Sequence, residues 1–171
     1  MQDRIRKIAL VSILTATAVA SRVILAPLPN IKPIGFLCLF AGIIGGPIVG
    51  FLVGSLTMVV TDVMFFGAGL WTFATSFSMG IVGFLGYMFA RYNGGFTRFN
   101  LFVFTYFSIL FYDIFTSVST SYVFGTPIIT SLVMLFLPTP YPFGPAHEIT
   151  NALLASLVIP EVYSRVKGDL I

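Results

Sequence analysis

Residues 34–66 read IGFLCLFAGIIGGPIVGFLVGSLTMVVTDVMFF, and this stretch contains a single charged side chain, Asp62. Such an apolar run is longer than the roughly 20 residues that cross a bilayer as a helix. Gly45, Gly46 and Pro47 interrupt the run, because proline lacks a backbone N–H and glycine permits sharp turns. The stretch therefore predicts a short helix over residues 34–44 and a full transmembrane helix over residues 48–66.

The composition of the whole chain extends this prediction to an all-α, polytopic membrane protein. Of the 171 residues, 57% are hydrophobic and 9% are charged, and the mean hydropathy is +1.01. A soluble domain carries about 25% charged residues, so lipid must cover this surface. Further apolar runs occupy about residues 5–26, 72–90, 101–124 and 146–166. We expect one domain over residues 1–171, folded as a bundle of six transmembrane helices, with residues 126–145 forming a long loop that has room for one short helix.

Basic residues predict the orientation in the cell membrane. If the N-terminus is cytoplasmic, six crossings leave only Arg22 and Lys32 on the outer side. The cytoplasmic ends then carry Arg4, Arg6, Lys7, Arg91, Arg98, Arg165 and Lys167. This bias follows the positive-inside rule and predicts that both termini are cytoplasmic. Because the basic residues lie at helix ends rather than on one soluble face, the net charge of +3 does not indicate nucleic acid binding.

The other polar residues gather in the outer halves of the expected helices. A charged side chain within a membrane span is costly and usually marks function. A channel or proton relay would carry polar groups through the whole depth, whereas a protein that captures an external solute needs them only near its outer mouth. We therefore expect a substrate-binding site there. Its candidate residues are Arg22, Asn30, Lys32, Asp62, Trp71, Thr72, Asp113, His147 and Asn151.

Structural roles are the alternative for several of these residues. The acidic side chain of Asp113 could tie helices together by pairing with Arg22, and Trp71 could belong to an interfacial aromatic belt. Asp113 also shares a helix face with Thr116, Ser117 and Thr120, at offsets of three, four and seven residues. That polar stripe is typical of a hydrogen-bonding wall.

Sequence motifs of catalysis are missing. The segment from His147 to Asn151 resembles the HExxH zinc motif, but Asn151 replaces the second histidine and the chain contains only one histidine. Zinc needs three or four protein ligands. Neither GxxxxGK[ST] nor GxSxG occurs, so ATP hydrolysis and serine hydrolase chemistry are not expected. We expect no enzyme activity, no cofactor and no metal site.

Small residues line one face of the first expected helix. Ser12, Ala16 and Ala20 recur every fourth residue, so their side chains lie one above another. Small side chains let helices approach closely within a membrane. This face is therefore a candidate docking surface for a partner helix.

Taken together, these features resemble a substrate-binding (S) component of an energy-coupling factor (ECF) transporter. The resemblance covers most of the chain and depends on the order and spacing of its segments. These are Ala16-x-x-x-Ala20, Arg22, Pro29-Asn30-Ile31-Lys32-Pro33, Ala41-Gly42, Gly46-Pro47-Ile48-Val49-Gly50-Phe51, Asp62, Gly67-Ala68-Gly69-Leu70-Trp71-Thr72, Asp113, Pro142-Phe143, His147 and Asn151. The pattern is closest to the branch that includes cobalamin-type S components.

The resemblance implies a compact six-helix bundle that captures a vitamin or related micronutrient on the outer side of the membrane. It also implies a transmembrane coupling protein, which docks on the face of Ala16 and Ala20, and two ABC-type ATPases that supply energy. Two alternatives remain open at the level of the sequence. One is a stand-alone facilitator or secondary carrier, and the other is a membrane scaffold subunit without a solute of its own.

Overall fold

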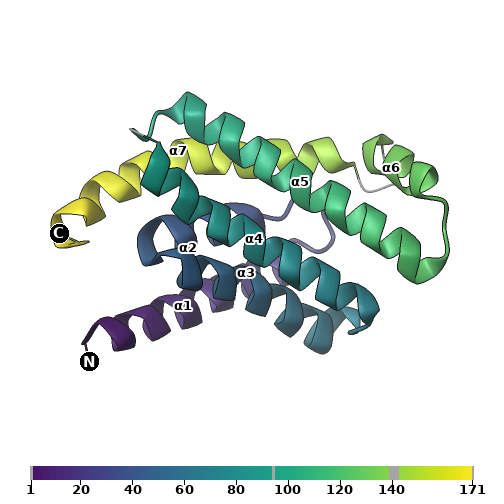
Figure 1. Ribbon diagram of the computed structural model, residues 1–171, viewed down its shortest axis with the longest axis horizontal. Coiled ribbons are helices and arrows are strands. Elements are labelled where there is room, and N and C mark those ends of the chain that lie inside the picture. Colours follow the sequence, from purple (N-terminus) through teal and green to yellow (C-terminus); the bar gives the residue numbers. More distant parts are fainter. Residues whose placement is uncertain (1, 94, 139–142, 171) are drawn as a thin grey trace.

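The computed structural model describes residues 2–93, 95–138 and 143–170, and these residues form helices and short connections (Figure 1). The elements in chain order are α1 (Gln2–Ile24), α2 (Ile34–Gly45), α3 (Pro47–Thr61), a π-helical turn η1 (Asp62–Phe66), α4 (Leu70–Tyr92), α5 (Arg98–Phe124), α6 (Ile128–Phe136) and α7 (Gly144–Leu170). The prediction of an all-α fold is confirmed. Residues 139–142, which include Pro142 of the quoted pattern, lie outside the described part of the chain, as does Gly94.

Four of the described helices are long and apolar enough to cross a membrane, namely α1, α4, α5 and the continuous helix formed by α3 and η1. Helices α2 and α7 differ from a regular transmembrane helix, because α2 has only 12 residues and α7 contains Pro160 within its 27 residues. These findings support a multi-pass membrane protein, while the expected count of six spans is not established by length and hydropathy.

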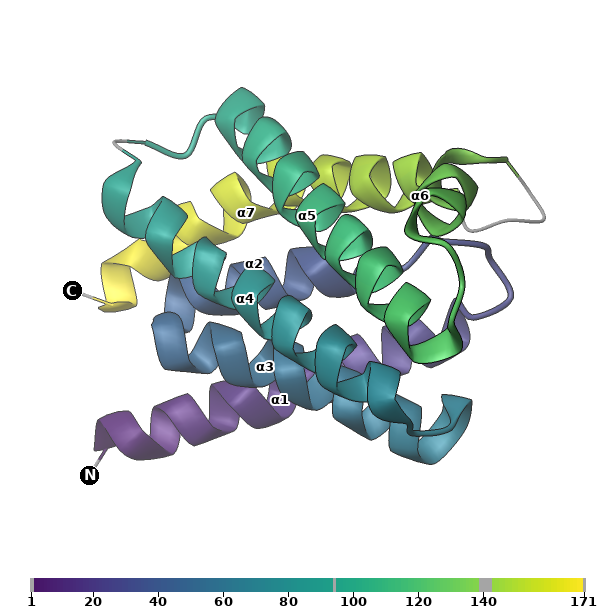
Figure 2. The ribbon, with the colours of Figure 1, turned by 45° about the vertical axis from the view of Figure 1, so that its right-hand side comes forward.

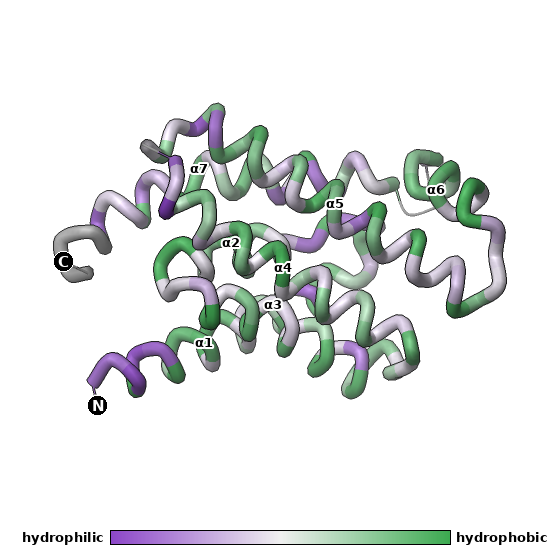
Figure 3. Tube along the Cα trace, in the orientation of Figure 1, coloured by the Kyte–Doolittle hydropathy of each residue, from purple (hydrophilic) through white to green (hydrophobic). Residues whose placement is uncertain are grey.

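Large apolar side chains on the outside of the bundle fit contact with lipid. Ile13, Phe73, Phe107 and Leu157 come from four different helices, and each is more than half exposed. A soluble monomer rarely exposes so much apolar surface. Figure 3 shows hydrophobic residues along most of the helices and hydrophilic ones at the start of α1 and around the connection from α4 to α5.

Glycines hold α2, α3 and α4 in close contact. The two residues Gly50 and Gly83 face one another so closely that a Cβ atom on Gly83 would overlap the Gly50 carbonyl oxygen. Gly42 meets the same turn of α4, where its missing side chain makes room for the Gly83 carbonyl. Between α2 and α3, Gly46 turns the chain with a φ of 89°, a left-handed value that favours glycine. The glycine pattern thus serves both packing and the turn between the two helices.

The two ends of the bundle differ in what they carry. Both termini and the connection between α4 and α5 lie at one end (Figures 1 and 2). The loop of residues 25–33, the turn between η1 and α4, and helix α6 lie at the opposite end. This second end holds the polar site described next.

Candidate functional site

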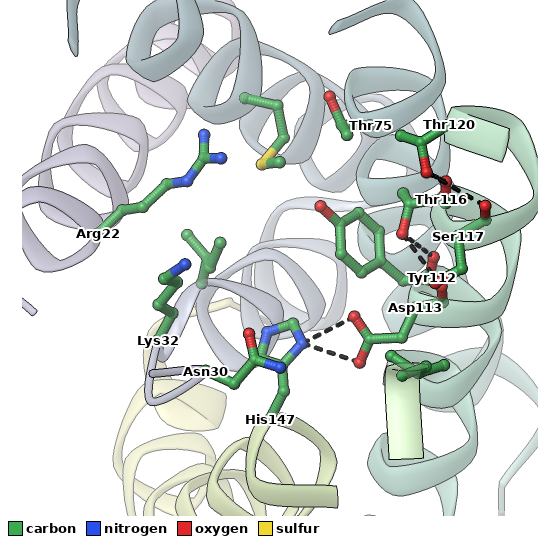
Figure 4. A pocket seen from close by; sticks show the side chains of 13 residues that line it. Arg22, Asn30, Lys32, Thr75, Tyr112, Asp113, Thr116, Ser117, Thr120 and His147 are labelled. Atoms are coloured by element: carbon green, nitrogen blue, oxygen red, sulfur yellow. Dashed lines mark hydrogen bonds and ion pairs between the residues drawn. The ribbon is translucent and has the colours of Figure 1, made fainter. Parts of the chain in front are cut away.

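A polar cavity of about 260 Å³ opens among the helix ends opposite the termini (Figure 4). Helices α1 to α7 and the loop before α2 all contribute to its walls. Its lining residues are Arg22, Asn30, Lys32, Ile34, Met58, Thr75, Tyr112, Asp113, Thr116, Ser117, Thr120, Leu135 and His147. The mixture of a few polar groups with apolar side chains is typical of small-molecule sites.

The arginine in the last turn of α1 is held by an ion pair across the bundle. Its guanidinium Nη1 lies 2.9 Å from Oδ1 of Asp62, whose side chain is only 2% exposed. The same nitrogen also donates to the hydroxyl of Thr61, and the guanidinium stacks 4.8 Å from the ring centroid of Phe66. Because these contacts come from the end of α3 and from η1, they fix Arg22 at the cavity wall.

The loop before α2 places a second cation beside this arginine. Asn30 adopts a φ of 52°, a left-handed conformation that asparagine tolerates better than most residues. Asn151 of α7 then fixes the loop, because its amide nitrogen donates to the carbonyl oxygen of Lys32 at 2.9 Å. The amide oxygen of Asn151 accepts from the backbone N–H of Phe36 at 2.8 Å, which satisfies one of the free donors in the first turn of α2.

The opposite wall consists of hydroxyl and carboxylate groups on α5. The hydroxyl of Thr116 donates to the carbonyl oxygen of Tyr112 at 2.9 Å, and the hydroxyl of Thr120 donates to that of Thr116 at 2.8 Å. Their protons are therefore used within the helix, and their oxygen lone pairs remain available to the cavity. Within the stripe predicted from the sequence, Thr116 and Thr120 thus present acceptors to the cavity, while the hydroxyl of Ser117 can also donate.

An imidazole and a carboxylate close the floor of the cavity. Nδ1 of His147 lies 2.9 Å and 3.1 Å from the two carboxylate oxygens of Asp113, and both side chains are buried. Because an ionised carboxylate only accepts, Nδ1 carries the proton in this pair. Nε2 of His147 is buried and has no hydrogen-bond partner in the described part of the chain, so in the neutral ring it offers a lone pair. Glu148 next to it is fully buried, but it does not line the cavity.

Five of the nine candidate substrate-binding residues line this cavity: Arg22, Asn30, Lys32, Asp113 and His147. The other four lie around it. Asp62 pairs with Arg22, and Asn151 bridges α7 to the loop and to α2. At the start of α4, Trp71 stacks on Phe124 with ring centroids 5.7 Å apart, and Thr72 accepts a hydrogen bond from the N–H of Gly69.

Five lining residues were not identified from the sequence: Ile34, Met58, Thr75, Tyr112 and Leu135. Thr75 follows Thr72 by one helical turn, so a search along that face of α4 would have found it. Leu135 belongs to α6, within the segment that the sequence indicated as a loop. The apolar residues carry no local signal, because they look like any other residue of a membrane helix.

The candidate docking face lies on a different side of α1. Ser12, Ala16 and Ala20 are exposed and line a groove of about 550 Å³ between α1 and α3. The other residues of this groove are Val11, Thr15, Val19, Val23, Ile24, Leu56, Val60 and Phe65. Within α1, only Ala18 is fully buried, so most of this helix is free to meet a partner or lipid.

Comparison with known protein families gives one match, which covers residues 2–144 with the family described as ECF-type riboflavin transporter, S component. This match spans most of the chain. The protein belongs to the ECF transporter S components. No curated protein and no solved structure matches the chain.

As an S component, the protein is the substrate-binding membrane subunit of an ECF transporter. It binds a vitamin and associates in the membrane with a transmembrane coupling protein and ATPases. Substrate capture is thus favoured over the alternatives of a stand-alone carrier and of a scaffold without a solute. The match also corrects the expected branch, because the family is the riboflavin type and not the cobalamin type. An ordered series of short motifs identifies the common scaffold, but it did not separate the branches.

Proposed function

We propose that the cavity between Arg22, Lys32, Asp113 and His147 is the capture site of this S component, and that its ligand is a flavin vitamin. The family description, which names riboflavin, supports the chemical class. The observation that carries the proposal is the buried Asp113–His147 pair on the cavity floor, which leaves Nε2 of His147 without a partner. A volume of about 260 Å³ lies near the lower limit of about 300 Å³ for ligand sites and favours a small vitamin over a macrocycle.

The candidate residues divide into two roles in this proposal. Arg22, Asn30, Lys32, Asp113 and His147 contact the ligand, because their side chains line the cavity. Asp62 and Asn151 position the contact residues, through the ion pair with Arg22 and the hydrogen bond to Lys32. Trp71 and Thr72 shape the start of α4, from which Thr75 reaches the cavity.

We further propose that the cavity faces the outside of the cell and that both termini are cytoplasmic. Arg4, Arg6 and Lys7 lie at the end of the bundle that carries the termini, and so do Arg91 and Arg98 on either side of the connection from α4 to α5. The positive-inside rule favours this end on the cytoplasmic side. Six crossings of the membrane, with α2 as a short one, agree with this orientation. Labelling of single cysteines, introduced at Ala26 and Gly95 after Cys38→Ala, with a membrane-impermeant maleimide should modify only the first position in intact cells.

The groove of Ser12, Ala16 and Ala20 is proposed to dock the coupling protein. The family requires such a partner, and small exposed side chains on an otherwise apolar groove allow a helix to approach closely. The groove is separate from the capture cavity, because the two share no lining residue.

Ala16→Leu/Ala20→Leu should therefore abolish uptake and co-purification with the coupling protein while leaving flavin binding by the isolated subunit intact. Thr17→Leu is a matched control, because Thr17 is exposed on the same helix but does not line the groove. Loss of flavin binding in the double variant would show that this face packs within the subunit and would defeat the docking proposal.

The ligand class itself is tested by mass spectrometry of small molecules that co-purify with the protein in detergent. A flavin is expected in the wild-type sample and should be depleted in His147→Ala. Recovery of a different vitamin, depleted by the same substitution, would replace the flavin but keep the site.

A further inference from the structure

Two cations meet at one wall of the cavity, and in the described part of the chain only one of them has a counter-ion. Arg22 and Lys32 both extend from the side of α1 and the loop toward the open centre (Figure 4). Arg22 is paired with Asp62 at 2.9 Å. Within residues 2–93, 95–138 and 143–165, whose side chains the structure describes, no ion pair involves Lys32, although this side chain is half-buried. The wall therefore carries one positive charge that no described side chain compensates.

The surroundings of Lys32 make this charge unfavourable in the empty site. Burial is the main cause that lowers the pKa of Lys32, and the positive charge of Arg22 lowers it further, while the smaller effect of the Asp113 carboxylate acts in the opposite direction. Asp113 cannot serve as the missing counter-ion, because its carboxylate is engaged by Nδ1 of His147. An anion bound at Lys32 would relieve the repulsion and supply the charge-assisted hydrogen bonds that an ammonium group favours.

The walls of the cavity differ in hydrogen-bonding character. Arg22 and Lys32 offer only donors on one side. Thr116, Thr120 and the carboxylate of Asp113 offer acceptors on the other side, where the hydroxyls of Tyr112 and Ser117 can both donate and accept. A ligand that satisfies both walls has an acceptor-rich or anionic end and a separate edge with N–H or O–H donors.

We propose that the natural ligand carries an anionic group, a phosphate or a carboxylate, seated at Lys32 beside Arg22, with its donor edge against Asp113, Thr116 and His147. This inference rests on the proposed function, because it assumes that this cavity binds the ligand. It narrows the substrate class from flavins in general to acidic derivatives of the vitamin.

The test is a fluorescence-quenching titration of the purified protein with three flavins. These probes are neutral riboflavin, riboflavin 5′-phosphate and a flavin with an N10-carboxymethyl group in place of the ribityl chain. At least one acidic flavin is expected to bind about 10- to 150-fold more tightly than riboflavin, which is the range for one hydrogen bond to a charged group. The phosphate and carboxylate arms distinguish the two kinds of anion.

Lys32→Gln should remove this advantage, so that the acidic flavins bind this variant no more tightly than neutral riboflavin does. Riboflavin binding by this variant also shows that it is folded, and Lys32→Arg should retain most of the preference. Arg98→Gln is the control, because Arg98 lies on the exposed surface, away from the cavity, and forms an ion pair with Glu161.

The outcomes separate the two proposals. Equal affinity for all three flavins, or an acidic preference that survives in Lys32→Gln, would overturn the anionic ligand and leave the flavin site intact. Failure of all three flavins to bind would overturn the flavin ligand. In that case inorganic phosphate and acetate are the probes. At least one of them should raise the unfolding temperature of wild type more than that of Lys32→Gln. If neither anion does so, the anion site is overturned as well.

Discussion

Nδ1 of His147 in α7 lies 2.9 Å from Oδ2 of Asp113 in α5, and this pair joins two helices that meet at the floor of the polar cavity. The carboxylate accepts from Nδ1, so that in the neutral form of the ring Nε2 is an acceptor. A hydrogen bond at one ring nitrogen of a histidine fixes the tautomer, and thereby decides whether the other nitrogen donates to a ligand or accepts from it. The geometry therefore gives Asp113 a positioning role as well as its place in the lining.

Asp113→Asn should weaken flavin binding without unfolding the protein. An asparagine can donate its amide N–H to Nδ1, which would move the imidazole proton to Nε2 and turn the acceptor into a donor. We expect an affinity about 10- to 150-fold lower, as for the loss of one hydrogen bond to a charged group. Calorimetric titration measures the affinity, and the unfolding temperature in detergent is the control for folding. Wild-type affinity in Asp113→Asn would show that the pair only ties α5 to α7.

Removing one partner of the ion pair between Arg22 and Asp62 should destabilise the protein, because the other charge then lacks its counter-ion. Asp62→Asn leaves an arginine that is 14% exposed without its counter-ion. Breaking one partner of such a buried pair costs about 3–5 kcal/mol. Chemical unfolding in detergent should show a loss of this order, and the double variant Arg22→Met/Asp62→Leu should recover a large part of it. A double variant no more stable than the single one would contradict this account.

Because α3 packs closely against α4, adding one methyl group at their interface should lower the stability of the protein clearly. Gly83→Ala places a Cβ atom against the Gly50 carbonyl, and such overpacking costs about 1–3 kcal/mol. Gly95→Ala is the matched control, because a Cβ atom there meets nothing within 4 Å. The two unfolding temperatures should therefore differ clearly, with Gly95→Ala close to wild type. Similar unfolding temperatures for both variants would mean that α3 and α4 can separate at little cost.

Lys32→Met should stabilise the ligand-free protein while it impairs the binding of acidic ligands. The pKa of Lys32 is lowered from its ordinary value of 10.5, so the folded state releases this proton before the unfolded state does. Wild-type stability should rise with pH between the lowered value and 10.5, because the unfolded state binds more protons in that window. Lys32→Met should lack this rise and be the more stable protein at neutral pH. Parallel pH profiles of the two unfolding temperatures would contradict the prediction.

Helix positions were predictable from the sequence because each depends on a local pattern. The expected helix over residues 48–66 corresponds to α3 with η1, and that over residues 101–124 falls within α5. Pro47, at the first position of α3, and Gly46, with its positive φ, mark the boundary that the sequence indicated.

The site was predictable only in part, because depth in the membrane does not fix which way a side chain points around its helix. Asp113 and Asn151 were placed at similar depth, yet Asp113 lines the cavity while Asn151 turns to the loop and to α2. The apolar lining from Met58 and Leu135 depends on packing between distant segments.

The most direct test of the capture site is the affinity of riboflavin and riboflavin 5′-phosphate for wild type, His147→Ala and Asn100→Ala, measured by fluorescence quenching in one detergent. Asn100 lines a separate groove between α4 and α5, so it controls for binding elsewhere on the apolar surface. We expect that His147→Ala loses at least about tenfold in affinity for the flavin that binds wild type, while Asn100→Ala binds it like wild type. Unchanged binding by a folded His147→Ala protein, or a loss confined to Asn100→Ala, would contradict the assignment of the cavity.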